Sequence, residues 1–195
     1  MLALTLDAGA HLRDLEPWHA DEFAAHVDRI RDHLKPWIPF ASRIYDADGA
    51  RDLLQRFADK RAADTGRFYG LWLDGELSGG TLFKEFDTAS GVCEVGVWLA
   101  PWATGRGLIT RAVTSMIDWA VGERGMHRIE WRTDPRNERS RAAAARLGMT
   151  REGVLRSSFV IGDTRFDTEV WAILADEWRG QRTRATMASA TASGA

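Results

Sequence analysis

The sequence predicts a single mixed α/β domain with helices on both faces of a twisted, mostly antiparallel central sheet of about seven strands. Three observations predict this fold class. The chain has 195 residues, the size of one ordinary domain. Its hydrophobic spacing switches between a helical and a strand period along the chain. Three strand-like stretches follow one another through short connections, which indicates antiparallel pairing, whereas later strands are separated by helical stretches.

The first third of the chain is predicted to be mainly helical. A short strand is expected at Leu12–Leu15, and Pro17 suits the first turn of the helix that follows. The apolar residues of this helix recur at helical spacing: Phe23, Val27, Ile30 and Leu34. The segment LKPWIPF ends the helix because its two prolines break it. A second helix is expected over about 47–63.

The spacing then changes to that of strands. RFYGLWL is a strand, DGE a hairpin turn and LSGGTLFKEF the returning strand. After the loop DTASG, VCEVGVWLA is a third strand. A long helix follows, and its apolar residues share one face: Ile109, Val113, Met116, Ile117, Ala120 and Val121.

The last third combines strands with one helix. RGMHRIEWRT begins a strand, NERSRAAAARLGM forms a helix with Gly148 as its C-terminal cap, and EGVLRSSFVI and RFDTEVWAIL are the final strands. We therefore expect one domain over residues 1–179. The small and polar residues of 180–195 predict a disordered tail.

Composition argues against several classes of protein. Hydrophobic residues make up 45% and charged residues 28% of the chain, as in globular proteins. A net charge of −2 gives no general attraction to nucleic acid. We expect no membrane span, since no apolar run approaches roughly 18 residues, and no secretory signal, since the start lacks a basic segment. A cytoplasmic location is the expectation.

Cysteine and histidine usage favours neither a disulfide nor a metal site. Cys93 is the only cysteine, and we expect it to be a small buried strand residue. His19, His26 and His33 recur every seven residues, which is typical of a solvated or cleft-side helix face. No metal is expected.

The segment PWATGRGLITRAV, residues 101–113, places two glycines between a strand and a helix. Gly105 and Gly107 allow backbone geometries that a Cβ would prevent. The first N–H groups of the following helix lack intrahelical partners, and the helix dipole favours an anion there. Arg106 adds a positive charge. By itself this segment is either a diphosphate cradle or an ordinary turn, because it matches neither a P-loop nor a full dinucleotide fingerprint.

The preceding strand, CEVGVWL, leads directly into this turn and contains Gly96. A glycine inside a strand often marks a bulge or a close backbone neighbour. If the strand separates from its neighbour here, its backbone groups could pair with a ligand that carries amides. Coenzyme A has a diphosphate at one end and two amides along its arm.

Taken together, these segments resemble the GNAT superfamily of N-acyltransferases, and within it the RimJ/RimL-like group that acetylates the N-termini of ribosomal proteins. Gly105 and Gly107 match both glycines of the motif Arg/Gln-x-x-Gly-x-Gly/Ala, whereas Trp102 stands at its Arg/Gln position. Further matches are LKPWIPF, CEVGVWL, NERSRAAAARLGM followed by TREGVLR, and GDTRFDTEVWAIL.

The resemblance implies a GNAT-type domain with a V-shaped split between the fourth and fifth strands. It implies acetyl-CoA, or another acyl-CoA, as co-substrate, and an amine acceptor such as a ribosomal or other protein N-terminus. A homodimer would fit the group. The cofactor-binding residues that it implies are, for the pantetheine, the backbone of Val97, Trp98 and Leu99; for the diphosphate, the backbone of Ala103, Thr104, Gly105, Arg106, Gly107 and Leu108; and near the thioester, Asn137 and Ser140.

Two residues are candidates for the chemistry of acyl transfer, which needs a neutral amine, a donor for the oxyanion and a proton for the departing thiolate. Glu94 is expected to deprotonate the amine directly or through water, or to be a structural acceptor. Ser140 is expected near the sulfur, or to serve only as a helix-start hydrogen bond. The tyrosine that many relatives carry four residues later is Ala144 here, and Ser158 stands where a RimL-like carboxylate is expected.

The few acids and bases predicted near the site favour an acceptor of low pKa. A peptide α-amine has a pKa of about 7.7–8.0 and lysine about 10.4, so far more of the α-amine is neutral at pH 7. Two alternatives stay open. One is the same chemistry on a small amine, such as an amino acid, polyamine or antibiotic; the other is a catalytically silent module that binds acyl-CoA.

Overall fold

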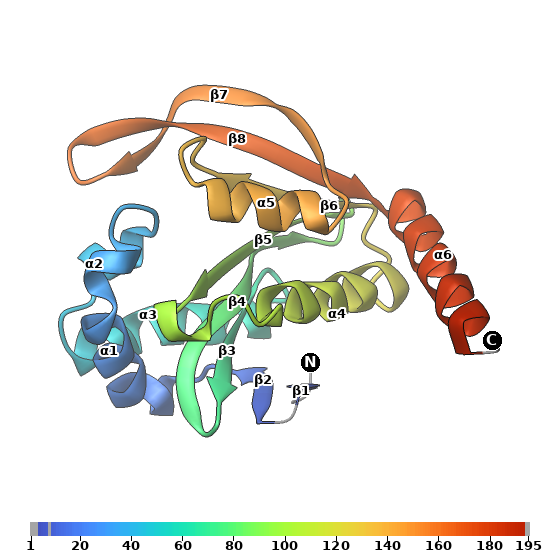
Figure 1. Ribbon diagram of the computed structural model, residues 1–195. Coiled ribbons are helices and arrows are strands. Elements are labelled where there is room, and N and C mark those ends of the chain that lie inside the picture. The colour runs from blue at the N-terminus through green and yellow to red at the C-terminus, as the bar shows by residue number, and fades with distance from the viewer. Residues whose placement is uncertain (1–3, 8, 194–195) are drawn as a thin grey trace.

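The computed structural model describes residues 4–7 and 9–193, and its described strands form one sheet (Figure 1). The strands lie in the order β1-β2-β3-β4-β5-β6-β8-β7. Their bounds are β1 Leu4–Asp7, β2 Ala10–Asp14, β3 Arg67–Leu73, β4 Glu76–Asp87, β5 Val92–Leu99, β6 Arg128–Thr133, β7 Thr150–Ile161 and β8 Thr164–Leu174. The mixed, mostly antiparallel α/β fold class is confirmed.

Helices cover both faces of this sheet (Figure 1). The α-helices are α1 Ala20–Arg29, α2 Arg31–Leu34, α3 Ala47–Ala62, α4 Leu108–Gly122, α5 Glu138–Arg146 and α6 Ala175–Ser193, and the short 3-10 helices are η1 Pro17–His19, η2 Pro39–Ser42 and η3 Pro101–Ala103. One hydrophobic core lies between the sheet and α4 and α5. A second core lies between the sheet and α1 and α3. None of the described helices is long and apolar enough to cross a membrane.

Every neighbouring pair of strands is antiparallel except β5 and β6, which run parallel. Their pairing joins Val92–Val95 to Arg128–Trp131 and then stops, although β5 continues to Leu99. We call the place where β5 and β6 are no longer paired the split. It lies between the two strands for which the V-shaped separation was predicted.

The amino-terminal elements differ from prediction in two respects. The sheet has eight strands rather than about seven, because β1 adds a four-residue edge strand that is too short to produce a clear periodic pattern. The strand expected at Leu12–Leu15 is β2, Ala10–Asp14. The expected four-turn helix is divided at Ile30, whose φ of −116° departs from helical geometry, yet its predicted apolar face is buried.

The carboxy-terminal segment also differs from prediction, because α6 continues through Ser193 over most of the predicted disordered tail. Its first half is fixed to the domain: the Trp178 indole Nε1 donates to Asp118 over 2.8 Å, and Arg182 forms an ion pair with the same carboxylate. Composition could not reveal these anchors, since Asp118 lies 60 residues away in sequence. The domain boundary at residue 179 stays a prediction.

Candidate active site

The two glycines of the segment 101–113 form a left-handed turn at the start of α4. Gly105 has a φ of +79° and Gly107, the N-cap of α4, a φ of +69°. A Cβ at Gly105 would meet nothing within 4 Å, so this side of the turn faces open space. Both positions favour glycine because residues with a Cβ rarely adopt positive φ. The turn therefore exposes its backbone to any ligand in front of it.

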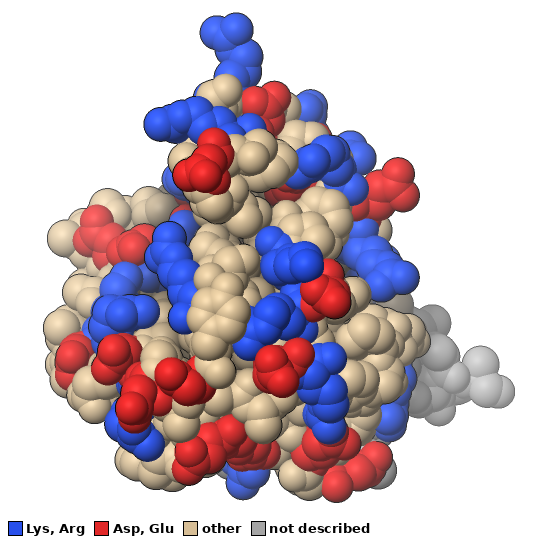
Figure 2. All heavy atoms as spheres, turned by 90° about the vertical axis from the view of Figure 1, so that its left-hand side faces the viewer, with Lys and Arg blue, Asp and Glu red and all other residues tan. Residues whose placement is uncertain are grey.

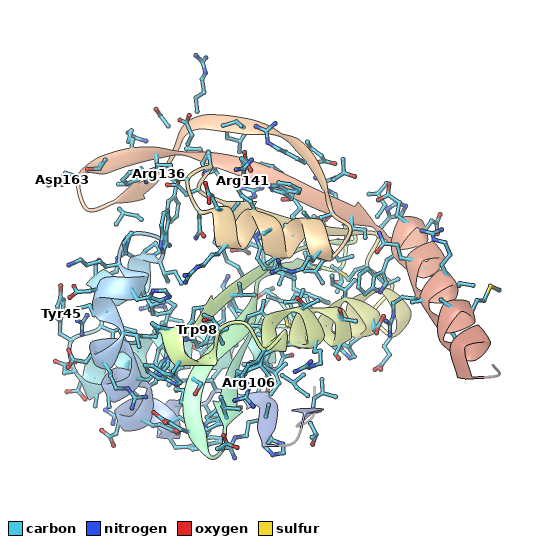
Figure 3. The ribbon with its side chains drawn as sticks, in the orientation of Figure 1. Tyr45, Trp98, Arg106, Arg136, Arg141 and Asp163 are labelled. Carbon is cyan, nitrogen blue, oxygen red and sulfur yellow. The ribbon has the colours of Figure 1, made fainter. Side chains whose placement is uncertain are left out.

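The helix that follows has N–H groups available at this turn. The Arg111 N–H is bonded to the Gly107 carbonyl, so the three N–H groups before it, those of 108–110, precede the intrahelical ladder. No side chain caps this end, and the first turn of α4 contains no acidic residue. Such an end binds anions through its N–H groups and the helix dipole. Figure 3 shows Arg106 and Trp98 at this same end of α4.

The rest of the predicted diphosphate segment supports the turn. Ala103 is buried in η3, and the Thr104 hydroxyl donates to the Pro101 carbonyl over 2.7 Å. The Leu108 side chain is buried in the core under α4, so only its backbone lies at the turn. Arg106 is exposed. The predicted segment thus combines a buried anchor at each end with an exposed centre.

The backbone of β5 has one free edge at the split. The Ala100 N–H donates to the Ser78 carbonyl over 2.8 Å, toward β4. Backbone groups of successive strand residues point to alternate edges, so those of Trp98 also face β4, and those of Val97 and Leu99 face the split. Of the three residues predicted to hold the pantetheine through their backbone, Val97 and Leu99 thus have backbone groups at the split, and Trp98 does not.

The Trp98 side chain belongs to the second core and does not face the split. It is 2% exposed, and its Nε1 donates to His26 Nε2 over 3.3 Å. His26 is therefore buried in the core, whereas the seven-residue spacing predicted a solvated or cleft-side helix face. Burial first, and then the nearby Arg29, lowers the pKa of His26 to about 4. The imidazole is neutral at pH 7, as an acceptor of the indole hydrogen bond must be.

Ser140 lies in the first turn of α5 and faces β6. The Trp131 indole Nε1 donates to Ser140 Oγ over 3.0 Å, and Trp131 itself is 1% exposed. Asn137 is the N-cap of α5, and its side-chain oxygen accepts the Ser140 backbone N–H over 3.1 Å. The cap function is thus performed by Asn137 rather than by the serine hydroxyl. Because Ser140 Oγ accepts from the indole, its own hydrogen remains for another acceptor.

Glu94 lies on β5 in a row of alternating charges. Lys84 Nζ donates to its Oε1 over 3.0 Å, and Arg132 Nε lies 3.6 Å from its Oε2. Arg132 is also paired with Glu130, whose pKa is lowered: burial acts to raise it, but hydrogen bonds from Arg128 and Arg132 outweigh burial.

The two predicted catalytic residues lie on opposite faces of the sheet. Trp131, which holds Ser140, belongs to the core under α4 and α5. Glu94 is the register partner of Glu130, the neighbour of Trp131, and side chains alternate between faces along a strand. Ser140 and Glu94 therefore lie on opposite faces of the sheet, close to Val95 and Trp131, the last pair of β5 and β6.

A buried carboxylate that the sequence analysis did not single out fixes α5 in place. Glu169 on β8 is 2% exposed and accepts from Arg141 Nε on α5, Arg151 Nε on β7 and the Trp171 indole at 3.0, 2.9 and 3.0 Å. Burial acts to raise the pKa of Glu169, but these three donors outweigh it, and the pKa is lowered. The only sequence signal was an acidic residue at an inward-facing position of a strand.

Neither Cys93 nor a group of metal-binding side chains contributes to the candidate site in the described part of the chain. Cys93 is buried as expected, and burial, then Glu130, raises the pKa of its thiol to about 12, so it is no nucleophile at neutral pH. Among the described residues no group of three or more histidines, cysteines and carboxylates could hold a metal ion. On the face shown in Figure 2, basic and acidic side chains are interleaved rather than separated by sign.

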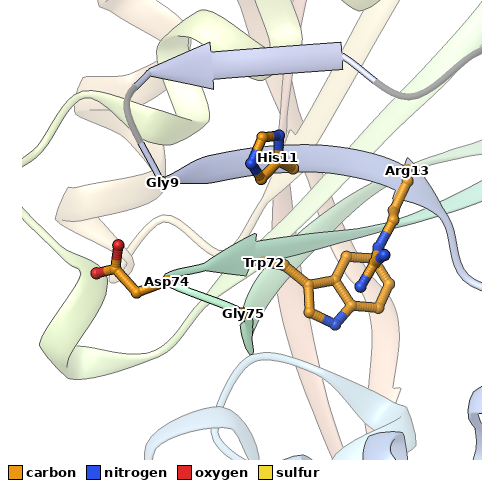
Figure 4. Close-up of a pocket in the computed structure, with 6 residues that line it drawn as sticks. All are labelled: Gly9, His11, Arg13, Trp72, Asp74 and Gly75. Carbon is orange, nitrogen blue, oxygen red and sulfur yellow. The ribbon is translucent and has the colours of Figure 1, made fainter.

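One surface hollow, of about 420 Å³, lies away from the split (Figure 4). It is lined by Gly9, His11, Arg13, Trp72, Asp74 and Gly75. The Arg13 guanidinium stacks over the Trp72 ring at 4.0 Å from its centroid. The hollow is built on β2 and β3, and β4 separates these strands from β5. None of the predicted catalytic or cofactor residues lines it.

The sequence is similar to those of known N-acetyltransferases over most of its length. The putative ribosomal N-acetyltransferase YdaF of Bacillus subtilis is 28% identical over 176 residues, which cover 88% of this chain and 94% of YdaF. The [ribosomal protein uS5]-alanine N-acetyltransferase of Escherichia coli is 27% identical over 172 residues, which cover 86% and 87% of the two chains.

Solved structures show the same fold. A probable acetyltransferase superposes with a TM-score of 0.80 at 26% identity, covering 91% of this chain and 99% of that one. RimL, a ribosomal L7/L12 α-N-protein acetyltransferase in complex with coenzyme A, superposes with a TM-score of 0.84 at 16% identity, covering 90% and 99% of the two chains, which supports the fold alone. The family described as acetyltransferase (GNAT) domain matches residues 10–150. Because this family model matches well over half of the chain, the chain belongs to the acetyltransferase (GNAT) domain family.

Proposed function

We propose that this protein transfers an acetyl group from acetyl-CoA to the N-terminal α-amine of a protein or peptide. Two features that follow one another along the chain support the proposal: the edge of β5 beyond Val95, which is no longer paired with β6, and the glycine turn at the start of α4. The relatives named ribosomal N-acetyltransferases support a protein N-terminus as acceptor. A cytoplasmic location and a homodimer remain expectations.

The residues at the split suit the two ends of coenzyme A. The backbone N–H and C=O groups of Val97 and Leu99 would pair with the amides of the pantetheine arm, as a peptide pairs with a sheet edge. The turn from Ala103 to Leu108 would hold the diphosphate through its own N–H groups and those at the start of α4. When bound, the co-substrate supplies an acyl carbon activated as a thioester.

Ser140 has the geometry for assisting the departure of the thiolate. The amine nitrogen attacks the thioester carbon and loses a proton, the C–S bond then breaks, and the sulfur gains a proton. With its oxygen held by the Trp131 indole, the Ser140 hydroxyl would donate its hydrogen toward that sulfur. Asn137 holds the first turn of α5, and therefore Ser140, at this position.

Glu94 has a different role in this proposal. It would accept a hydrogen bond from the incoming amine or from a water molecule, on the face opposite Ser140. Its ion pairs with Lys84 and Arg132 make it part of a charge network rather than an isolated base. The reaction then depends mainly on amines that are already neutral.

This dependence favours an α-amine over a lysine. Roughly a tenth of an α-amine is neutral at pH 7, but only about one lysine in a few thousand. The difference in pKa corresponds to about 3 kcal/mol, which a site without a dedicated base would not recover. A lysine acceptor would therefore react roughly a few hundredfold more slowly at equal binding.

The proposal is tested by measuring thiol release from acetyl-CoA with three acceptor sets. These sets are peptides with free N-termini, peptides with a blocked N-terminus and one lysine, and small amines such as amino acids and polyamines. We expect the free N-terminal peptides to give the highest kcat/KM. Faster reaction of the lysyl peptides or small amines would overturn the choice of acceptor, and CoA binding without turnover on any amine would indicate a silent module.

A further inference from the structure

The buried carboxylate of Glu169 joins three elements beside the first turn of α5. Arg141 Nε on α5 and the Trp171 indole on β8 both donate to its Oε2 over 3.0 Å. Arg151 Nε on β7 donates to its Oε1 over 2.9 Å. Figure 3 shows Arg141 between α5 and β8. The carboxylate is thus the point at which the start of α5 is attached to the last two strands.

Arg141 directly follows Ser140, so two consecutive residues of α5 are held by neighbouring strands. Ser140 Oγ accepts from the Trp131 indole on β6, whereas Arg141 is bonded to Glu169 on β8. Trp131 and Trp171 are register partners across β6 and β8, so the two indoles lie on the same face of the sheet. Consecutive residues of a helix project about 100° apart around its axis. Two anchors at this angle restrict rotation of the helix, and with it the position of Ser140 Oγ, more than either anchor does alone.

The chemistry of the second anchor indicates a role beyond packing. The helix is already held to the core by apolar residues, among them Ala143 and Ala144. Apolar contacts are non-directional, whereas a bond from a guanidinium to a carboxylate has a defined geometry. A buried ion pair also loses hydration, and well-packed apolar residues in its place are often equally or more stable. The bond between Arg141 and Glu169 therefore supplies an orientation that apolar packing alone would not fix.

We propose that Arg141 and Glu169 are positioning residues for acyl transfer: their ion pair sets the rotation of α5 so that the Ser140 hydroxyl points at the sulfur of the thioester. This role rests on the proposed function, in which Ser140 donates the proton to the departing thiolate. Neither Arg141 nor Glu169 touches the reacting atoms, and both act through Ser140. Misplacing a catalytic group by about 1 Å can cost roughly a hundredfold in rate, so loss of the tether should lower kcat.

Two arginine variants test this role, because they remove matched bonds to the same carboxylate. Arg141→Gln removes the bond from α5, and Arg151→Gln removes the bond from β7; the two side chains are 40% and 46% exposed. In steady-state assays of thiol release, we expect Arg141→Gln to lower kcat roughly three- to thirtyfold, with KM for acetyl-CoA within about twofold. Arg151→Gln should lose a similar amount in Tm but keep kcat within about twofold. Equal losses of kcat in the two variants would overturn the role, as would an unchanged kcat, or a rise in KM alone, in the folded Arg141→Gln protein.

A double-mutant cycle separates positioning from a general loss of structure. Because Arg141 acts through Ser140, Arg141→Gln should change kcat by no more than about twofold in a Ser140→Ala background. Losses that multiply in the double variant would show that Arg141 does not act through Ser140. Arg141→Lys keeps a point charge without the planar fork, so it should retain part of kcat. If Arg141→Gln does not fold, Arg141→Lys decides by the same comparisons.

A spectroscopic measurement tests the tether without turnover. The indole N–H resonance of Trp131, assigned by comparison with Trp131→Phe, reports the bond to Ser140 Oγ. We expect this resonance to shift, and its exchange with solvent to become faster, in Arg141→Gln but not in Arg151→Gln. An unchanged resonance in Arg141→Gln would overturn the role. Failure of the proposed function would look different, since the unaltered protein would then acetylate no amine while the resonance still responded to Arg141→Gln.

Discussion

Alanine substitutions at Gly105 and Gly75 can distinguish a loss of CoA binding at the glycine turn from the backbone strain that both substitutions cause. Both have positive φ, +79° and +86°, and a Cβ at either one would meet nothing within 4 Å. Gly75 belongs to the hairpin turn between β3 and β4, away from the split. An alanine at either site must adopt a left-handed backbone, which costs about 1–2 kcal/mol. For a domain of this size, each variant should lose about 2–8 °C in Tm.

CoA affinity should distinguish the two variants. In Gly105→Ala the new Cβ occupies the open space in front of the turn, where the phosphate must approach the backbone N–H groups. Loss of one such charge-assisted hydrogen bond corresponds to about 1.5–3 kcal/mol, or roughly a ten- to hundredfold rise in Kd. Gly75→Ala should leave Kd unchanged. Calorimetric titration with CoA measures both, and equal affinities in two variants of equal Tm would refute the assignment of the turn as the diphosphate site.

Four further predictions concern the surrounding residues. Trp102→Ala should weaken CoA binding less than Gly105→Ala in the same titration, because the turn binds mainly through its backbone. Ser140→Ala should lower kcat about 10- to 100-fold with KM for acetyl-CoA nearly unchanged, in steady-state assays of thiol release; a full kcat would remove Ser140 from the mechanism. Glu169→Gln should lower the free energy of unfolding by about 2–4 kcal/mol at pH 7, since the buried carboxylate holds two half-exposed arginines. Folding lowers the pKa of Glu169, so this stabilisation is present above the unfolded pKa of about 4.3 and disappears as the pH falls. In denaturant titrations, the free energies of unfolding of the original protein and of Glu169→Gln should therefore converge in acid. Burial lowers the pKa of His26 to about 4, so on acidification the unfolded state binds a proton before the folded state does. The free energy of unfolding should therefore fall by about 2 kcal/mol between pH 7 and pH 5. His26→Gln should reduce this fall, and the same pH dependence in both proteins would contradict the prediction.

Much of the fold is predictable because its signals are local. The apolar face of α4 and the glycine cap at Gly148 depend on residues within one or two turns of each other. The turn between β3 and β4 depends on Asp74 and Gly75, which both have positive φ, as the central residues of a two-residue β-hairpin turn do. The strand β1 was not predicted because its pairing with β2, and not a periodic pattern, stabilises it, and the first turns of α6 are anchored by Trp178 and Arg182 to Asp118 on α4.

The candidate site divides in the same way. The glycine turn and its place between a strand and a helix could be predicted from the sequence, because positive φ and unpaired helix N–H groups are properties of a few consecutive residues. The tertiary structure sets the residue at which pairing of β5 with β6 ends, Val95, and it places Ser140, held by Trp131, on the face opposite Glu94. The physical reason is that strand register and core packing join residues far apart in sequence, and these contacts set which groups of each residue remain available for chemistry.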